Sequence, residues 1–310
     1  MAQKLMKEVF IDYLREEMAR DEKRVLLDAD LAKCIGSTSI YKAFPDRAFD
    51  VGIAEANMTS IAGGMSSYGY KPWITSFTPF VSRRNADQIA ISIAYSKQNV
   101  KIVGTDPGIT AELNGGTHMG IEDVGILRSI PNTVVVEIVD ETQLRKAIPV
   151  INDYYGCVYM RMFRKDTPIC MPENYEFDLF KADVLREGSD VSIFATGIMV
   201  DTALKAADVL KEKGLNAEVI NVHTIKPIDV ETVLASVRKT NSCVVCENHN
   251  IIGGLYSAIT EVTARNNPVK VVPVGIPDVS GEVGKMPYLR ERMGMTVDDV
   301  VNACFEARRK

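Results

Sequence analysis

The stretch Asp50-Val-Gly-Ile-Ala-Glu55-Ala-Asn57-Met58 carries one carboxylate, Glu55, where a strand-like pattern gives way to a helix-like one. Gly63 and Gly64 follow inside the expected helix, where glycine is unfavourable, so close approach of another backbone or a ligand is expected. An acid held among apolar groups can share a proton with a ring nitrogen. The plainer alternative is an acid that only stabilises the start of a helix.

The composition is that of an ordinary globular protein. The 310 residues are 46% apolar and 25% charged, enough for two domains with large cores. A net charge of -5 leaves no surplus of lysine and arginine for nucleic-acid phosphates. No apolar run approaches the roughly 20 residues that cross a bilayer, and the first residues lack an apolar signal core. We therefore expect a cytoplasmic protein.

Six cysteines are scattered along the chain, which does not indicate a disulfide framework. The spacing Cys243-x-x-Cys246-x-x-His249 could belong to a metal site. Zinc needs four ligands, however, and no second Cys/His pair stands elsewhere in the sequence. Buried thiols on a strand are the preferred interpretation, and no metal site is predicted.

Short apolar segments alternate with helical patterns along the whole chain. This alternation predicts an α/β fold of two domains, each with a mainly parallel sheet covered by helices. Prolines and mixed charges interrupt it once, which predicts domains at residues 1–170 and 186–310 with a linker at 171–185. Residues 32–46 are expected to form a polar loop, and residues 80–96 one helix.

A glycine-rich segment from Gly104 to Gly120 follows a predicted strand in the first domain. Ligands of open parallel sheets bind beyond the carboxyl ends of the strands, so a site is expected here. The segment supplies Asp106, Glu112, Asn114 and His118 as candidate polar groups. The alternative is a plain turn with a solvated histidine.

Two phenylalanines, Phe77 and Phe80, stand three residues apart and just before Arg83 and Arg84. An aromatic ring in such a position could stack on a planar group of a cofactor. Ordinary core packing at the start of a helix would produce the same spacing.

Two arginines, Arg161 and Arg164, close the last predicted strand of the first domain. Arginine binds phosphate through two parallel N–H groups, so either residue could bind a phosphorylated ligand. Surface salt bridges are the alternative for both residues.

Several of these motifs together resemble those of thiamine-diphosphate-dependent transketolases, in order and at similar spacing. The motifs of the first domain are Ile53-Ala-Glu55-Ala-Asn57-Met, Phe77-Thr-Pro-Phe80, Ala86-Asp87-Gln88-Ile89, Gly115-Gly-Thr-His118, Ile121-Glu-Asp123 and Arg128-Ser-Ile-Pro131-Asn132. Those of the second domain are Ala195-Thr-Gly197, Thr224-Ile-Lys-Pro227, Glu247-Asn-His249, Ile252-Gly-Gly-Leu255 and Gly275-Ile-Pro-Asp278. The resemblance covers nearly the whole chain and implies a pyrimidine-binding domain followed by a transketolase C-terminal domain.

One element of that family is absent from the sequence, the Gly-Asp-Gly motif of the diphosphate-binding domain. The resemblance therefore implies the C-terminal subunit of a split transketolase. A separate N-terminal subunit is expected to bind the diphosphate of thiamine diphosphate through magnesium or calcium. A two-plus-two heterotetramer and an inactive lone chain are expected, as is a role in carbohydrate metabolism such as the pentose phosphate pathway.

The resemblance assigns four residues to the cofactor site. Glu55 matches the catalytic glutamate that hydrogen-bonds a pyrimidine ring nitrogen and so promotes loss of a proton from the thiazolium carbon. Phe80 matches the aromatic that stacks on the pyrimidine, with Phe77 beside it in the same pocket. Arg83 is expected at the same pocket.

The resemblance assigns five residues to the sugar substrate. His118 matches a catalytic histidine that contacts substrate hydroxyls, and Arg164 matches an arginine that binds phosphate. Lys7 stands roughly where the family has a phosphate-binding arginine. Asp106 and Asn114 are expected at the substrate too, although they replace other family residues, so phosphate capture and sugar specificity depart from the usual pattern.

The motifs leave three interpretations of the protein's function. The preferred one is a catalytic subunit that transfers a two-carbon ketol unit between a ketose and an aldose. Half of another thiamine-dependent enzyme, like a deoxyxylulose-phosphate synthase or the beta subunit of a 2-oxo acid dehydrogenase, is the second. The third is a non-catalytic regulatory partner, which would be expected to have lost Glu55.

Overall fold

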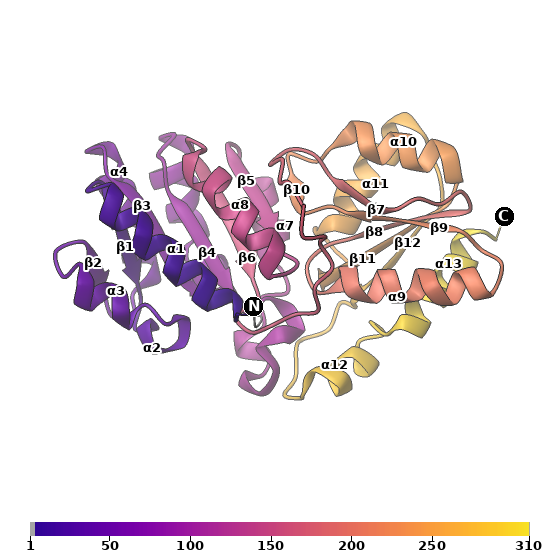
Figure 1. The fold of residues 1–310 in the computed structure, drawn as a ribbon, viewed down its shortest axis with the longest axis horizontal. Helices are drawn as coiled ribbons and strands as arrows, with labels where there is room; N and C mark the ends of the chain where they lie inside the picture. The colour runs from indigo at the N-terminus through magenta and orange to yellow at the C-terminus, as the bar shows by residue number, and fades with distance from the viewer. Residues whose placement is uncertain (1–3, 310) are drawn as a thin grey trace.

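The computed structural model describes residues 4–309, which form two sheets side by side (Figure 1). The first sheet has the strand order β10-β5-β6-β4-β3-β1-β2 and is parallel except at its edge strand β10. Its strands are β1 (Arg24–Asp28), β2 (Ala48–Asp50), β3 (Lys71–Phe77), β4 (Lys101–Thr105), β5 (Thr133–Glu137), β6 (Cys157–Met162) and β10 (Thr224–Lys226). Strands β1, β4, β5 and β6 are buried throughout, as expected of a parallel sheet covered on both faces.

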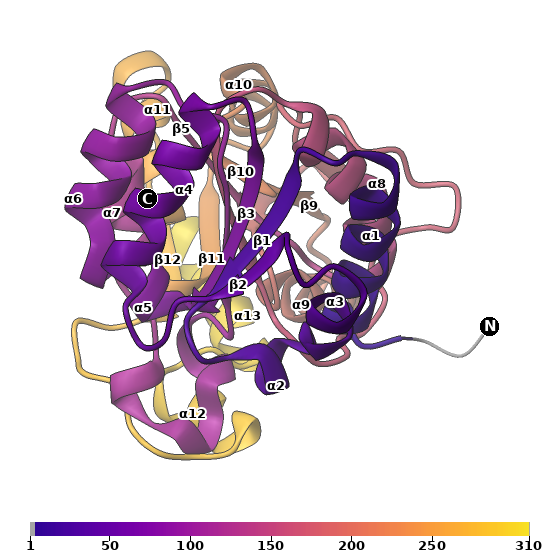
Figure 2. The same cartoon turned by 90° about the vertical axis from the view of Figure 1, so that its left-hand side faces the viewer.

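Helices cover both faces of this sheet (Figure 2). Helices α1 (Met6–Arg20) and α8 (Glu141–Asp153) lie on one face. Helices α4 (Glu55–Ser67), α6 (Ala86–Gln88) and α7 (Asp123–Ser129) lie on the other. The fold class predicted from the alternation of patterns is confirmed.

The second sheet has the order β12-β11-β8-β9-β7, with the edge strand β7 antiparallel. Its strands are β7 (Asp183–Arg186), β8 (Val191–Ala195), β9 (Ala217–Asn221), β11 (Cys243–Asn250) and β12 (Val271–Ile276). Figure 1 shows α10 (Val230–Thr240) and α11 (Leu255–Asn266) on one face, and α9 (Met199–Glu212) and α13 (Val297–Ala307) on the other. Thr296 and Asp299 form a capping box at the start of α13.

The two sheets share their apolar cores. Buried side chains form two layers, one on each side of the sheets, and each layer contains residues of both sheets. Strand β10 adds a covalent link, because it follows β9 in sequence yet pairs with β5 of the first sheet. The sheets are therefore fixed against each other by packing and by the return of the chain from β9 to the first sheet.

The expected polar loop at residues 32–46 is instead two short helices, α2 (Ala32–Ile35) and α3 (Thr38–Ala43). Ile35 and Ile40 are buried in the core shared with α1, so each helix has a reason to form despite its polar sequence. Only one residue of each helix is buried, which is too few to give a periodic pattern that predicts a helix.

The expected single helix at residues 80–96 is broken into pieces. They are α5 (Thr78–Val81), a 3₁₀ turn at Arg83–Asn85, α6, and a π-helix at Ile89–Tyr95. The Asn85 side chain donates hydrogen bonds to the Glu55 carbonyl and to Thr59 Oγ1, which holds the 3₁₀ turn against α4. This anchoring places the segment next to Glu55.

One of the two helix glycines has the close neighbour that the sequence predicted. A Cβ atom on Gly63 would lie 2.6 Å from the main-chain oxygen of Ser92, so only glycine lets α4 pack against the π-helix. Gly64 has no such neighbour within this chain, because a Cβ atom there would face open space.

The cysteines are all free, and Cys243 and Cys246 are buried. Burial raises the pKa of both thiols. Between residues 4 and 309, no group of three or more His, Cys, Asp or Glu residues is arranged to hold a metal ion. Over the same range, no helix is long and apolar enough to cross a membrane.

The carboxyl end of β11 fastens the second sheet to the glycine-rich segment of the first. Asn248 Nδ2 donates to the Pro107 carbonyl at 2.8 Å, and Asn248 Oδ1 accepts from the Ile109 amide at 2.9 Å. A Cβ atom on Gly108 would lie 2.2 Å from Asn248 Oδ1, so this residue must be glycine. The motif Glu247-Asn-His249 thus positions the segment that carries His118.

His249 is held as a neutral imidazole in the same motif. Its Nδ1 lies 2.6 Å from the Asn250 carbonyl and its Nε2 accepts from the Gly125 amide at 3.4 Å, which leaves the proton on Nδ1. Burial lowers the pKa of His249 to about 4, although the Asp123 carboxylate opposes the change.

We predict that stability falls as the pH drops from about 6.5 to 4, and that His249→Gln flattens this slope. The unfolded histidine takes up a proton near pH 6.5, whereas the folded one does so only near pH 4. The contribution of His249 to the free energy of unfolding is therefore constant above pH 6.5 and falls by roughly 3 kcal/mol by pH 4. Urea unfolding of both proteins across this range is the measurement, and equal slopes would refute the assignment.

Candidate active site

The candidate site lies beyond the carboxyl ends of β1, β2 and β3, the edge at which parallel sheets bind ligands (Figure 2). A cavity of about 230 Å³ opens there. Its walls include Glu55, Phe77, Phe80, Arg84 and His118, with residues of the turn after β1 and Ile53 completing it.

Glu55 is the first residue of α4, and its side chain is only 3% exposed. Its two carboxylate oxygens accept hydrogen bonds from Arg84 Nη1 at 2.9 and 2.8 Å. No side chain caps the start of α4, so Glu55 is not a helix cap. The acid faces the cavity with one cation beside it.

Three rings form a wall next to this acid. Phe80 meets Phe77 and His118 edge to face, with ring centroids 6.1 and 5.1 Å away. Phe77 and His118 are 5.6 Å apart in the same manner. The guanidinium of Arg84 lies over the face of Phe80, 4.4 Å from its centroid.

A second group of charges adjoins this wall. Arg164 donates from Nε to Asp106 Oδ2 at 2.6 Å and from Nη1 to the Cys34 carbonyl at 3.1 Å. Its guanidinium lies 5.1 Å from the centroid of Phe77. Lys7 Nζ approaches the same Cys34 carbonyl at 3.4 Å, so Lys7, Arg164 and Asp106 gather at one point.

Arg161 neither faces a phosphate site nor forms a surface salt bridge. Its side chain is 0% exposed and forms ion pairs with Asp123 and Glu137, both at 2.7 Å. It also donates to the main-chain oxygen of Asn248 in the second sheet at 3.0 Å. Burial raises the pKa of Glu137, and the Arg161 charge opposes that rise.

Two predicted site residues lie outside both the cavity and the charged group of Lys7, Asp106 and Arg164 beside it. Arg83 pairs with Glu122 and is half exposed. Asn114 is exposed at the end of a 3₁₀ segment, Gly108–Asn114. Neither lines the cavity that Glu55 faces.

Arg84 is the site residue that the sequence interpretation missed. Arg84 stands four positions after Phe80, and Arg83 stands three positions after it. Both spacings bring side chains together on a helix, so the spacing alone does not tell which arginine contacts Phe80. The 3₁₀ turn at Arg83–Asn85 decides which of them faces Glu55.

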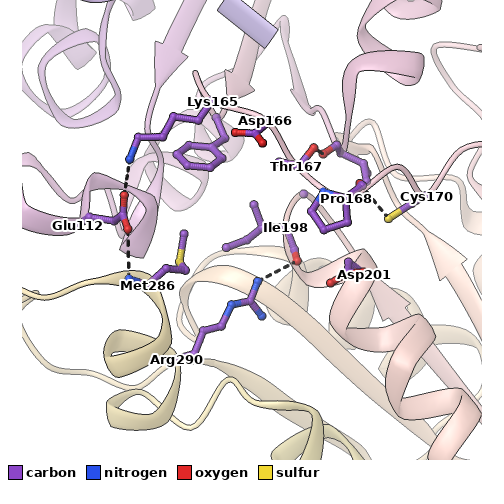
Figure 3. A pocket seen from close by; sticks show the side chains of 13 residues that line it. Glu112, Lys165, Asp166, Thr167, Pro168, Cys170, Ile198, Asp201, Met286 and Arg290 are labelled. Carbon is purple, nitrogen blue, oxygen red and sulfur yellow. Dashed lines mark hydrogen bonds and ion pairs between the residues drawn. The ribbon is translucent and has the colours of Figure 1, made fainter. Parts of the chain in front are cut away.

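A larger cavity of about 280 Å³ lies between the two sheets (Figure 3). There Lys165 Nζ pairs with Glu112 at 2.5 Å, and Glu112 accepts from the Met286 amide at 3.2 Å. Arg290 donates to Thr202 Oγ1 at 2.5 Å and to the Ile198 carbonyl. These contacts fasten α12 (Met286–Arg292) to its neighbours and do not resemble the acid-and-ring arrangement at Glu55.

Comparison with known protein families decides the identity of the fold. The transketolase pyrimidine binding domain matches residues 3–168, and the transketolase C-terminal domain matches residues 180–300. The chain belongs to the transketolase family. The resemblance noted from the motifs is confirmed.

Several similar proteins of this family carry names that describe them as a subunit or as the product of a split gene. The 6-deoxy-6-sulfo-D-fructose transketolase subunit SqwH of Clostridium sp. (strain MSTE9) is 49% identical over 97% of this chain and 94% of its own length. A subunit of the apulose-4-phosphate transketolase of Phocaeicola vulgatus is 31% identical over 97% of this chain and 96% of its own length. A solved structure titled "Split gene transketolase, inactive beta4 tetramer" superposes with a TM-score of 0.88 at 37% identity, covering 99% of this chain and 98% of the other.

The cavity of this transketolase-family chain fits the aminopyrimidine of thiamine diphosphate, the cofactor that a pyrimidine binding domain implies. Such a ring needs an acid beside a ring nitrogen and a flat apolar surface to stack on. Glu55 and Phe80 offer both, and the planar guanidinium of Arg84 already lies between them. A planar nitrogen-bearing group can therefore occupy this position.

We predict that Arg161→Met lowers the free energy of unfolding by about 3–5 kcal/mol, because it leaves two buried carboxylates without a cation. The matched control is Arg186→Met, which breaks a partly exposed pair with Asp208 and should cost at most about 1 kcal/mol. Urea unfolding of both variants measures the difference. Equal losses would show that the Arg161 ion pairs do not support the fold.

Proposed function

We propose that this chain is the C-terminal subunit of a transketolase that moves a two-carbon ketol unit from a ketose to an aldose. The observation that carries the proposal is Glu55, a buried acid facing an aromatic cavity within a pyrimidine binding domain. A regulatory partner without catalysis would not need to keep that acid.

Glu55 would accept a hydrogen bond from the pyrimidine ring nitrogen and hold the proton at that atom. Phe80 would stack on the ring, and Phe77 would exclude water beside it. When bound, the cofactor supplies the carbon nucleophile and the electron sink for the transfer. His118, whose ring stands against both phenylalanines, would donate to hydroxyls of the sugar.

The partner would be an N-terminal subunit with the diphosphate-binding domain, which would also hold magnesium or calcium. The supporting observation is that this sequence contains no Gly-Asp-Gly motif. The similarity to a split-gene transketolase that forms an inactive tetramer of one subunit agrees with a lone chain that does not turn over. We propose a two-plus-two heterotetramer as the active assembly.

The far end of the ketose would carry an anion, bound by Lys7 and Arg164. These two cations share their position with the Asp106 carboxylate, so the subsite has a formal charge of +1. A sulfonate carries one negative charge at pH 7, whereas a phosphate monoester carries about -1.5 to -2. The charge balance and the similarity to a sulfofructose transketolase subunit both favour a sulfonated ketose.

We predict that Glu55→Gln lowers kcat of the reconstituted complex by several orders of magnitude while assembly is unchanged, because an amide cannot hold the ring proton. The matched control is Glu231→Gln, which changes an exposed acid of the second sheet domain and should keep full turnover. Turnover is measured on 6-deoxy-6-sulfo-D-fructose with an aldose acceptor, and assembly by light scattering. Near-normal turnover of Glu55→Gln would remove this acid from the mechanism.

We predict that Arg164→Ala raises KM for the sulfonated ketose about 10- to 100-fold. This factor corresponds to the binding free energy of one charge-assisted hydrogen bond, which the variant loses. KM for uncharged fructose should stay the same, because fructose has no anion at that end. Lys165→Ala is the control, since Lys165 pairs with Glu112 away from the cavity. An equal rise in KM for both sugars would show that Arg164 acts on the structure and not on the anion.

A further inference from the structure

Arg84 makes two contacts that a bound aminopyrimidine would also make. Its Nη1 donates to both carboxylate oxygens of Glu55, and its planar guanidinium lies over the face of Phe80. One group of this chain therefore binds the acid and the stacking ring at the same time. The cofactor cannot make both contacts while Arg84 keeps them.

We infer that Arg84 is an internal stand-in for the cofactor's pyrimidine, which occupies the site in the free subunit and must leave when the cofactor binds. This inference rests on the proposed function. A guanidinium suits the task because it is planar, cationic and rich in N–H donors. It reproduces the flat shape of the ring and the hydrogen bond to Glu55.

The side chain of Arg84 is free to leave, although its backbone is fixed. The side chain is 47% exposed, whereas its partner Glu55 is 3% exposed. The next residue, Asn85, is buried and hydrogen-bonded to α4, so the turn itself stays in place. Rotation of one exposed side chain into solvent is enough to uncover Glu55.

Arg84 neutralises the buried Glu55 carboxylate in the free subunit. A buried carboxylate without a cationic or hydrogen-bonding partner lowers the stability of the fold, and here the compensating charge comes from the same chain. When the pyrimidine takes the place of Arg84, its hydrogen bond replaces part of that compensation. Arg84 therefore competes with the cofactor, and the apparent affinity for the pyrimidine falls by the fraction of chains in which the site is open.

The competition is tested on the isolated chain with 4-amino-5-hydroxymethyl-2-methylpyrimidine as the probe and titration calorimetry as the readout. If the stand-in occupies about nine-tenths of free chains, Arg84→Ala should bind the probe about tenfold more tightly than the wild type. Arg84→Lys keeps the charge but loses the plane, so its affinity should lie between the two. Arg145→Ala, which removes an arginine of similar exposure that pairs with Glu141, should bind like the wild type.

Equal or weaker binding by Arg84→Ala would overturn the inference, because it would show that Arg84 helps to hold the ring. Should Arg84→Ala fail to fold, the Arg84→Lys comparison decides in the same way. Failure of the proposed function looks different: no probe binding by any variant, together with no ketol transfer by the reconstituted pair. An active pair whose C-terminal chain binds the probe equally well with and without Arg84 would reject only the stand-in.

Discussion

Arg161 is a guanidinium that no water reaches, and the arrangement of the two domains depends on its partners. A buried arginine is stable only when carboxylates and carbonyls surround it. Asp123 and Glu137 of the first domain supply the charges, and the Asn248 carbonyl of the second domain supplies a further acceptor. A shift between the domains would therefore take an acceptor away from an N–H group of this buried guanidinium.

Two sets of contacts connect Arg161 and Asn248 to the candidate active site. Asn248 also binds the main chain at Pro107 and Ile109, which starts the segment that ends at His118. Arg161 itself lies on β6, and the chain that leaves this strand carries Arg164 to Asp106. The rings, the anion subsite and Glu55 are thus arranged by a network that takes no part in chemistry.

The buried strands were predictable because a covered parallel sheet requires unbroken apolar runs. Glu55, Phe77 and Phe80 were predictable as site residues because each follows such a run.

Other features depend on contacts between residues far apart in sequence, which no local pattern contains. Strand β10 pairs with a strand about ninety positions away in sequence, and Arg161 is buried by acids that are distant along the chain. The choice between Arg83 and Arg84 depends on a 3₁₀ turn fixed by Asn85, so the sequence indicated a basic residue near the ring but not which one. The catalytic and binding roles of the site residues remain predictions.

The most direct measurement is a structure of the two-subunit complex with thiamine diphosphate bound. The account predicts a pyrimidine ring nitrogen about 3 Å from a Glu55 oxygen, with the ring stacked on Phe80 and the Arg84 side chain turned away from both. A ring nitrogen that faces another group, or an Arg84 that still binds Glu55 beside a bound cofactor, would contradict it.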